Sequence, residues 1–373
     1  MNIAFFHELP EGGAKSSTLK MANLLCSFGY NVDLYYVAEK KDILNNYKFR
    51  NEFFYEFKQK KWVGNDWKKR LYKDTIELYK IYKLDRKIAA DINSKKYDLV
   101  LINASQFIES PFILRFLNSY KVFYAHDPNY RMIYEKSLDI SKKLSLLRYN
   151  YEKVNRTIRK RLDYLNIHRA NLILANSNFA SRVIFKTYNR RSTVVYLGVD
   201  ENLFKPKKVS KEIDILFVGT FDEIDGYDLL SDALKNIKNK LNVVAVPGKS
   251  RWISNQQHIV DLYQKSKIVV CLAINEPFGL VPLESMSCGV PVIAVNEGGY
   301  TETVVNNKTG FLVKRQKEKL AGKIKLLLDN PKLAKEMGNR GRKEILSNWT
   351  WEKRGKELEK VLLEDNENIS NNY

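Results

Sequence analysis

Residues 276–294, with the sequence EPFGLVPLESMSCGVPVIA, follow an apolar stretch that ends near Ala273 and is typical of a buried strand. Gly279 permits a tight loop after that strand, and Pro282 suits the first turn of a helix. Pro291 stops this helix after a few residues. The stretch therefore predicts a strand, a loop, a short helix and a second strand, the repeating unit of a parallel α/β sheet.

Two series of apolar strands are expected along the chain, separated by the polar stretch 206–212 (PKKVSKE). The fold class is therefore α/β, with two doubly wound, Rossmann-like halves joined near residue 208. Ligands of such sheets bind beyond the carboxyl ends of the strands, so we expect the site in a cleft between the halves. The first series comprises 2–7, 32–37, 99–103, 121–125, 172–175 and 193–196, and the second 213–219, 242–246, 268–272, 291–295 and 310–313.

Charge and composition restrict the partners of the chain. There are 63 Lys and Arg against 43 Asp and Glu, a net charge of +20, which favours an anionic partner such as nucleic acid, phospholipid or a phosphorylated small molecule. Three cysteines and four histidines disfavour a disulfide scaffold and a zinc site. Neither a signal peptide nor a run of about 18 apolar residues is found, so we expect a cytoplasmic protein whose membrane contact, if any, is peripheral.

Two segments are strongly basic. Residues 58–73 contain seven basic residues against one acid, together with Trp62 and Trp67, and residues 141–161 contain eight basic residues against Glu152 alone. Both stretches are expected to form basic, partly amphipathic helices. These helices either present solvated faces or attract anionic lipid at a membrane surface.

Two carboxylates flank the loop after residue 273. Glu276 lies on the loop and Glu284 on the helix, while the N–H groups of 278–280 point at whatever sits over the helix N-terminus, where an anion is favoured. Carboxylates beside an anion site suit hydroxyl groups, and a sugar joined to a nucleotide diphosphate supplies both hydroxyls and phosphates. Taken alone, the two glutamates also fit a solvated helix start favoured by the helix dipole.

The whole pattern E-P-F-G-L-x-x-L-E-S-M-x-x-G-x-P-V-I-A resembles the donor-site signature of the family-4 retaining glycosyltransferases of the GT-B fold. The resemblance covers essentially the whole chain and is strongest over 213–315. Other segments similar to the family, in chain order, are 10–13, 126–127, 175–177, 197–200 with Phe204, 297–303 and 310–313.

The resemblance implies a role for each matching donor-site residue. Glu284 would accept hydrogen bonds from the nucleotide ribose, and Glu276 would face the hydroxyls of the donor sugar. The backbone of Phe278, Gly279 and Leu280 would contact sugar and phosphate. Gly219 would lie near the donor at the start of the second domain.

The resemblance also implies roles in the first half of the chain. Gly12 and Gly13 would let the N-terminal loop close on the diphosphate, and His126 would contact the donor sugar as a catalytic group. The family transfers sugar with retention, by front-face displacement and without an obligatory metal or other cofactor, so Glu276 is not expected to act as a hydrolase-type nucleophile. Taken alone, Gly12 and Gly13 fit any turn, and His126 fits a hydrogen-bonded strand-end histidine.

These expectations define the domains and the function. Residues 1–205 are predicted to bind the acceptor and 206–349 the donor, with a helix over 350–365 crossing back to the first domain and a disordered tail over 366–373. The predicted activity is a retaining glycosyltransferase, specifically a hexosyltransferase, that moves a sugar from a nucleotide diphosphate to a glycan or a lipid-linked acceptor. The residue pattern leaves open the base, the sugar, the acceptor, the linkage and the oligomeric state.

One part of the sequence departs from the family. Thr220 stands where an Arg is expected and Asp225 where a Lys is expected, yet these two cations normally hold the departing diphosphate. Lys249 and Arg251, after the strand over 242–246, are candidate replacements or merely exposed loop charges. The stretch between that strand and residue 268 is also shorter than in the family.

Other functions stay open for the same reason. The donor is alternatively a lipid-monophosphate sugar, or the protein binds sugar without activity. A nucleic-acid partner is the third alternative, motivated by the net charge and the aromatic residues of 58–73.

Overall fold

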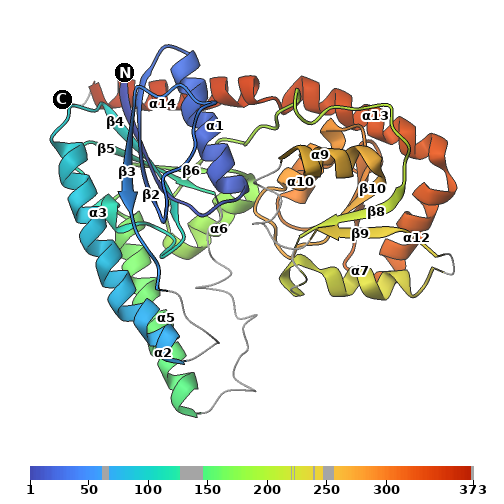
Figure 1. The fold of residues 1–373 in the computed structure, drawn as a ribbon, viewed down its shortest axis with the longest axis horizontal. Coiled ribbons are helices and arrows are strands. Elements are labelled where there is room, and N and C mark those ends of the chain that lie inside the picture. The colour runs from blue at the N-terminus through green and yellow to red at the C-terminus, as the bar shows by residue number, and fades with distance from the viewer. Residues whose placement is uncertain are drawn as a thin grey trace. The chain divides into compact units, whose positions relative to one another are not determined.

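The computed structural model describes residues 1–60, 67–126, 146–219, 221, 223–237, 240–246 and 256–370. These residues form two compact units (Figure 1). Unit 1 comprises Met1–Pro10, Ala14–Asn176 and Ser181–Val194, and unit 2 comprises Glu11–Gly13, Ser177–Ala180 and Val195–Tyr373.

Unit 1 is built on a seven-stranded parallel sheet of order β3-β2-β1-β4-β5-β6-β7, counted over the described residues. The central strands are almost wholly buried, because helices cover both faces of such sheets. The strand order reverses between β1 and β4. In sheets of this kind, ligands bind beyond the carboxyl ends of the two strands at which the order reverses. The strands are β1 Asn2–Glu8, β2 Asn31–Ala38, β3 Asn51–Glu56, β4 Leu99–Ser105, β5 Tyr120–Ala125, β6 Leu172–Ala175 and β7 Thr193–Val194.

Helices and single turns connect these strands. In α3 the buried apolar residues recur at helical spacing (Leu78, Ile81, Ile88 and Ile92), which gives the helix one core-facing side. The helices are α1 Gly13–Ser27, α2 Trp67–Tyr72, α3 Leu78–Asn93, α5 Leu146–Ile167 and α6 Asn178–Tyr188, with a π-helical turn over Lys73–Glu77 and a 3₁₀ turn over Phe112–Arg115.

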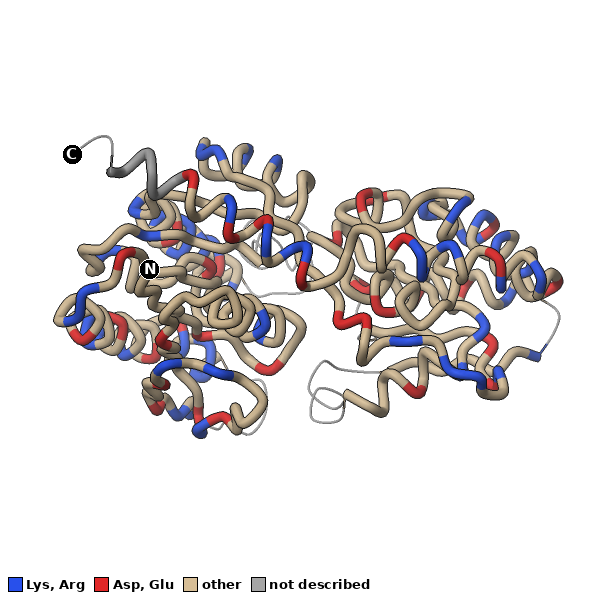
Figure 2. Tube along the Cα trace, turned by 90° about the horizontal axis from the view of Figure 1, so that it is seen from above, with Lys and Arg blue, Asp and Glu red and all other residues tan. Residues whose placement is uncertain are grey.

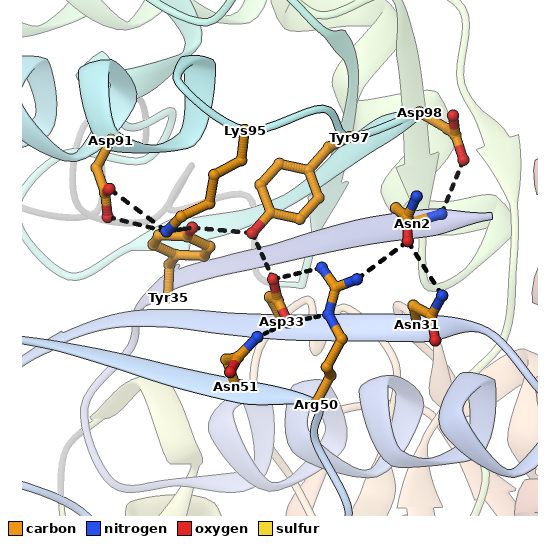
Figure 3. A network of polar contacts seen from close by, with 10 residues as sticks. All are labelled: Asn2, Asn31, Asp33, Tyr35, Arg50, Asn51, Asp91, Lys95, Tyr97 and Asp98. Carbon is orange, nitrogen blue, oxygen red and sulfur yellow. Dashed lines mark hydrogen bonds and ion pairs between the residues drawn. The ribbon is translucent and has the colours of Figure 1, made fainter.

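A polar network joins the amino ends of the first four strands of unit 1 (Figure 3). Asp33 of β2 is buried and accepts hydrogen bonds from Arg50 at 2.7 Å, Tyr97 at 2.5 Å and Asn51 at 3.0 Å. Arg50 also donates to Asn2 Oδ1, at the start of β1. The network therefore ties β1, β2, β3 and the residues before β4 together at the amino ends of the strands, away from the carboxyl ends where ligands are expected.

Unit 2 is built on a five-stranded parallel sheet of order β12-β11-β10-β8-β9 within the described part of the chain. The strand order reverses between β8 and β10. The strands are β8 Ile213–Val218, β9 Val243–Val246, β10 Ser266–Cys271, β11 Val292–Val295 and β12 Gly310–Val313. The helices are α7 Tyr227–Leu234, α9 Gln256–Lys265, α10 Leu280–Ser287, α11 Tyr300–Thr303, α12 Lys317–Asp329, α13 Pro331–Asn348 and α14 Trp351–Ser370, and a 3₁₀ turn spans Glu223–Asp225.

The predicted class, α/β with two doubly wound parallel sheets, is confirmed. The sequence did not predict β3, because half of its residues (NEFFYE) are polar and the strand lies partly exposed at the sheet edge. The domain bounds at 205 and 206 remain predictions. Helix α14 continues through 366–370, part of the predicted disordered tail, because no glycine or proline stops it there.

The two basic segments are only partly helical among the described residues. Within 58–73 the helix α2 has six residues, whereas α5 begins at Leu146 and runs beyond the predicted end of the second segment to Ile167. Residues 61–66, with Trp62, and 141–145 lie outside the described residues.

Candidate functional site

The loop between β10 and α10 has its shape fixed by close backbone packing. Gly298 and Gly299 lie directly against it, because a Cβ on Gly298 would come within 2.4 Å of the Glu276 carbonyl oxygen, and one on Gly299 within 2.5 Å of Phe278 Cα. The Gly299 N–H donates to the Glu276 carbonyl at 2.7 Å. Gly279, with φ of 103°, turns the chain into α10. The loop thus holds Glu276 and the N–H groups of 278–280 in one arrangement beyond the carboxyl end of β10.

Glu284 is held from the neighbouring helix α9. The Tyr263 hydroxyl donates a hydrogen bond to Glu284 Oε2 at 2.8 Å. Burial, followed by the nearby Glu284 charge, raises the pKa of Tyr263, so this phenol stays a donor at neutral pH. Glu276 and Glu284 are both half-buried, which suits carboxylates that accept hydrogen bonds from ligand hydroxyls.

The glycine loop that precedes α1 reaches the start of α10. Glu11–Gly13 group with unit 2, and a Cβ on Gly13 would lie 3.0 Å from Leu280 Cδ1. Gly12 is buried. The predicted donor residues Gly13 and Leu280 are therefore brought together, although they lie more than 250 residues apart in the chain.

Arg315 and Glu302 support this region, and no role was predicted for Arg315 from the sequence. Its guanidinium donates to the Leu272 carbonyl at 2.9 Å and pairs with Glu297 at 2.8 Å, which anchors the end of β10. Glu302 accepts hydrogen bonds from the backbone N–H of Asn178 at 2.9 Å and of Phe179 at 2.8 Å. No local pattern distinguishes Arg315 from other arginines, because its partners follow the ends of other strands, Glu297 18 residues and Leu272 43 residues earlier in the chain.

The turn after β8 carries the departure from the family pattern. Gly226 has φ of 77°, and a Cβ there would lie 2.4 Å from the Leu272 carbonyl oxygen, so this turn packs on the end of β10. A Cβ on Gly219 would lie 3.3 Å from Asp225 Oδ2, which brings Gly219 and the Asp225 carboxylate together. Thr220, Lys249 and Arg251 lie outside the described residues, so the structure does not locate a cation for the diphosphate there.

His126 lies in unit 1, directly after β5, with 4% of its surface exposed. Its Nε2 is 2.8 Å from Asn103 Oδ1 and 3.0 Å from Thr18 Oγ1. Burial lowers the pKa of His126 to about 3, so the ring is neutral at physiological pH. The second buried histidine of this edge, His7, has its pKa lowered to about 3 by burial and by the Lys15 charge.

The structure adds three polar residues near the carboxyl ends of the unit 1 strands: Lys15, Thr18 and Asn103. Lys15, in the first turn of α1, is buried and pairs with Asp42 at 2.7 Å. The position of Lys15 directly after Gly-Gly-Ala could have marked it as a site residue in the sequence. Asn103 lies within an apolar strand, and nothing in the sequence around it pointed to the site. No group of three or more His, Cys, Asp or Glu residues able to hold a metal is found in the described part of the chain.

Comparison with known proteins gives matches in sequence and in fold. Residues 245–344 match the family model of glycosyl transferases group 1. An uncharacterized glycosyltransferase of Methanocaldococcus jannaschii is 29% identical over 206 residues, which cover 48% of this chain and 56% of that protein. An alpha-1,3/1,6-mannosyltransferase of Dictyostelium discoideum is 24% identical over 318 residues, 68% of this chain and 72% of that protein. A GDP-mannose-dependent phosphatidylinositol monomannoside mannosyltransferase of Mycolicibacterium smegmatis is 41% identical over 88 residues, 23% of each chain.

Two solved structures share the fold over almost the whole chain. A sucrose-phosphate synthase of Thermosynechococcus elongatus superposes with a TM-score of 0.72 at 16% identity, covering 98% of both chains. An Anabaena protein in complex with UDP and glucose superposes with a TM-score of 0.66 at 17% identity, covering 97% of this chain and 99% of the other. At these identities the likeness shows the fold alone, which is of the GT-B type.

Proposed function

Because residues 245–344 match the family model of glycosyl transferases group 1, we propose that this protein is a retaining hexosyltransferase with a nucleotide diphosphate sugar as donor. The observation that carries the proposal is the loop between β10 and α10. Gly298 and Gly299 pack against this loop, which carries the half-buried Glu276 and leads into α10 with Glu284. The start of α10 suits a phosphate group. The relative named as a GDP-mannose-dependent mannosyltransferase, and the neighbour solved in complex with UDP and glucose, support a donor of this class.

In this proposal each part of the loop has one task. Glu284, held by Tyr263, accepts hydrogen bonds from the ribose, and Glu276 accepts them from the sugar. The N–H groups of 278–280 stabilise the charge that grows on the diphosphate as it leaves. The sugar is transferred with retention and without a metal, and neither glutamate acts as a covalent nucleophile.

Nucleotide binding tests this proposal. A thermal-shift series with UDP, GDP, ADP and their hexose derivatives compares the wild type with Glu284→Gln and with Glu318→Gln, an exposed glutamate of α12 as control. A nucleotide at 100 times its Kd stabilises the wild type by about 2.7 kcal/mol. Glu284→Gln is expected to weaken that nucleotide about tenfold or more, because a charged acceptor is lost. Equal binding by wild type and Glu284→Gln, or no binding of any nucleotide, would contradict the proposal.

The leaving diphosphate needs cations, and we assign them to Lys249 and Arg251. The turn after β8 supplies the Asp225 carboxylate instead of a lysine, which disfavours negative charge nearby. Lys249→Ala and Arg251→Ala are each expected to lower turnover. A double variant with unchanged kcat/KM would show that the cations come from elsewhere.

For the acceptor we propose a lipid-linked glycan reached at an anionic membrane surface. Helix α2 and the π-helical turn that follows it pack against α5: Arg70 of α2 pairs with Glu152 at 3.1 Å, and Asp74 of the turn pairs with Arg159 at 2.7 Å. Their outward sides combine exposed apolar residues with lysines and arginines: Trp67, Leu146, Leu147, Val154 and Ile158 with Lys68, Lys153, Lys160 and Arg161. Leu147 is 83% exposed and Trp67 60%. Such a mixture suits the headgroup layer of anionic lipid.

The described residues contain no helix with the length and apolar character needed to span a bilayer. Sedimentation with vesicles of neutral or anionic lipid tests the peripheral contact. The wild type is expected to bind anionic vesicles, and Leu147→Ser with Trp67→Ser to bind them several-fold less. Duplex DNA at the same ionic strength is the alternative arm, because Lys and Arg occur along the helices of both units (Figure 2). Tighter binding to DNA than to vesicles would favour the nucleic-acid partner.

A further inference from the structure

We propose that Asn103, together with Thr18, is a positioning residue that fixes His126 in the Nε2–H tautomer, so that Nδ1 accepts a hydrogen bond from a carbohydrate hydroxyl. The carbohydrate part of this inference rests on the proposed function, whereas the tautomer does not. Asn103 is on β4, Thr18 is on α1 and His126 follows β5, so three separate elements of unit 1 meet here.

The orientation of the Asn103 amide is set by the neighbouring strand. Its Nδ2 donates to the Phe6 carbonyl of β1 at 3.1 Å. The reverse orientation would place Oδ1 against that carbonyl oxygen, two acceptors facing each other. Oδ1 therefore faces His126 and Thr18, at 2.8 Å and 2.9 Å.

This orientation decides the tautomer of His126. An amide oxygen only accepts, so the Nε2 that lies 2.8 Å from Oδ1 must carry the hydrogen. The Thr18 hydroxyl is compatible, because it has one hydrogen, directed to the Ala14 carbonyl at 2.9 Å or to Asn103, and its lone pair faces Nε2. With Nε2–H fixed and the ring neutral, Nδ1 is left as a bare acceptor.

Nδ1 of His126 is buried and has no hydrogen-bond partner among the described residues. A buried acceptor without a partner is costly, which indicates that a bound group fills this role. Asn176 donates a hydrogen bond to the backbone carbonyl of His126, and the centroid of the imidazole ring lies 4.4 Å from that of the Tyr124 ring. Backbone and ring are thus both in contact with neighbouring residues. A bare nitrogen repels phosphate oxygens and pairs with O–H donors, so the group that it selects is a hydroxyl.

Nitrogen-15 NMR of histidine-labelled wild type tests the tautomer without any substrate. The His126 signals, assigned by their loss in His126→Asn, are expected to show a protonated Nε2 and a bare Nδ1. In Asn103→Leu, which lacks the acceptor, the Nε2–H preference is expected to decrease. Asn93→Leu is the matched control, because Asn93 bonds the Phe116 carbonyl and the Asn118 N–H at the opposite edge of the sheet. A protonated Nδ1 in the wild type would overturn the proposal whatever the variants do.

Deoxygenated donors test the carbohydrate contact. With the nucleotide sugar that supports turnover, removal of one hydroxyl is expected to lower kcat/KM about tenfold in the wild type, the size of one hydrogen bond. The same deoxy donor is expected to cause little further loss in Asn103→Leu, because the two changes remove one contact. If, for every hydroxyl removed, the deoxy donor lowers kcat/KM by the same factor in Asn103→Leu as in the wild type, the contact is ruled out. If no nucleotide sugar is turned over, the proposed function and the contact fail together, while NMR still decides the tautomer.

Discussion

Gly279 is the residue on which the shape of the donor loop depends. Its φ of 103° is open to glycine and strained for other residues, and a Cβ there would lie 2.9 Å from Tyr300 Cδ1. A side chain at this position therefore meets both backbone strain and a ring held in the core.

Gly279→Ala is expected to lower the free energy of unfolding by about 1–3 kcal/mol and to weaken nucleotide binding. Gly322→Ala is the matched control: Gly322 lies within α12 with open space around its Cβ position, so the same substitution is expected to stabilise the protein by about 0.5–1 kcal/mol. Urea unfolding and nucleotide titration measure both. Equal behaviour of the two variants would show that the loop tolerates a different shape.

At the scale of elements, the network around Asp33 holds the amino ends of the unit 1 strands together (Figure 3). Burial alone would raise the pKa of Asp33, but hydrogen bonds from Arg50, Tyr97 and Asn51 outweigh it, and the pKa is lowered. A carboxylate with a lowered pKa stabilises the folded state above its unfolded pKa of about 4, and that stability is lost as the pH falls through the folded pKa.

Asp33→Ala is expected to cost about 3 kcal/mol, because Arg50, Tyr97 and Asn51 lose their shared acceptor. The free energy of unfolding of the wild type is expected to fall below about pH 4, and that of the variant to fall less steeply, because the variant lacks the carboxylate that is protonated there. Asp232→Ala removes an exposed carboxylate that pairs with Lys235 three residues on. The Lys235 hydrogen bond also lowers the pKa of Asp232, but an exposed pair contributes little, so both effects are expected to be much smaller than in Asp33→Ala. Unfolding curves from pH 3 to pH 8 provide the comparison, and an unchanged acid limb in Asp33→Ala would contradict this account.

At the scale of the whole molecule, each unit has its own sheet and its own buried core. The proposed donor loop belongs to unit 2, whereas the Asp33 network belongs to unit 1. Nucleotide binding is therefore expected to slow hydrogen exchange of the backbone amides more in unit 2 than in unit 1.

Hydrogen exchange with and without the stabilising nucleotide measures this difference. Exchange is expected to slow most at α10 and at 298–303, with little change at β2 and β3. Protection confined to β2 and β3 would place the nucleotide elsewhere and contradict the donor loop. Helix α12, which is not part of the donor loop, serves as an internal reference in the same experiment.

Local patterns in the chain were enough to predict the alternation of strands and helices, the α/β class and the loop over 276–280, because apolar spacing, Gly279 and Pro282 act on their nearest neighbours. The strand order, the edge strand β3, the packing of Gly298 and Gly299 and the anchoring by Arg315 depended on tertiary structure. So did the contacts of Thr18 with Asn103 and His126, which lie 85 and 108 residues further along the chain. Contacts over such separations are decided by how the sheet is wound and packed, and no local periodicity encodes them.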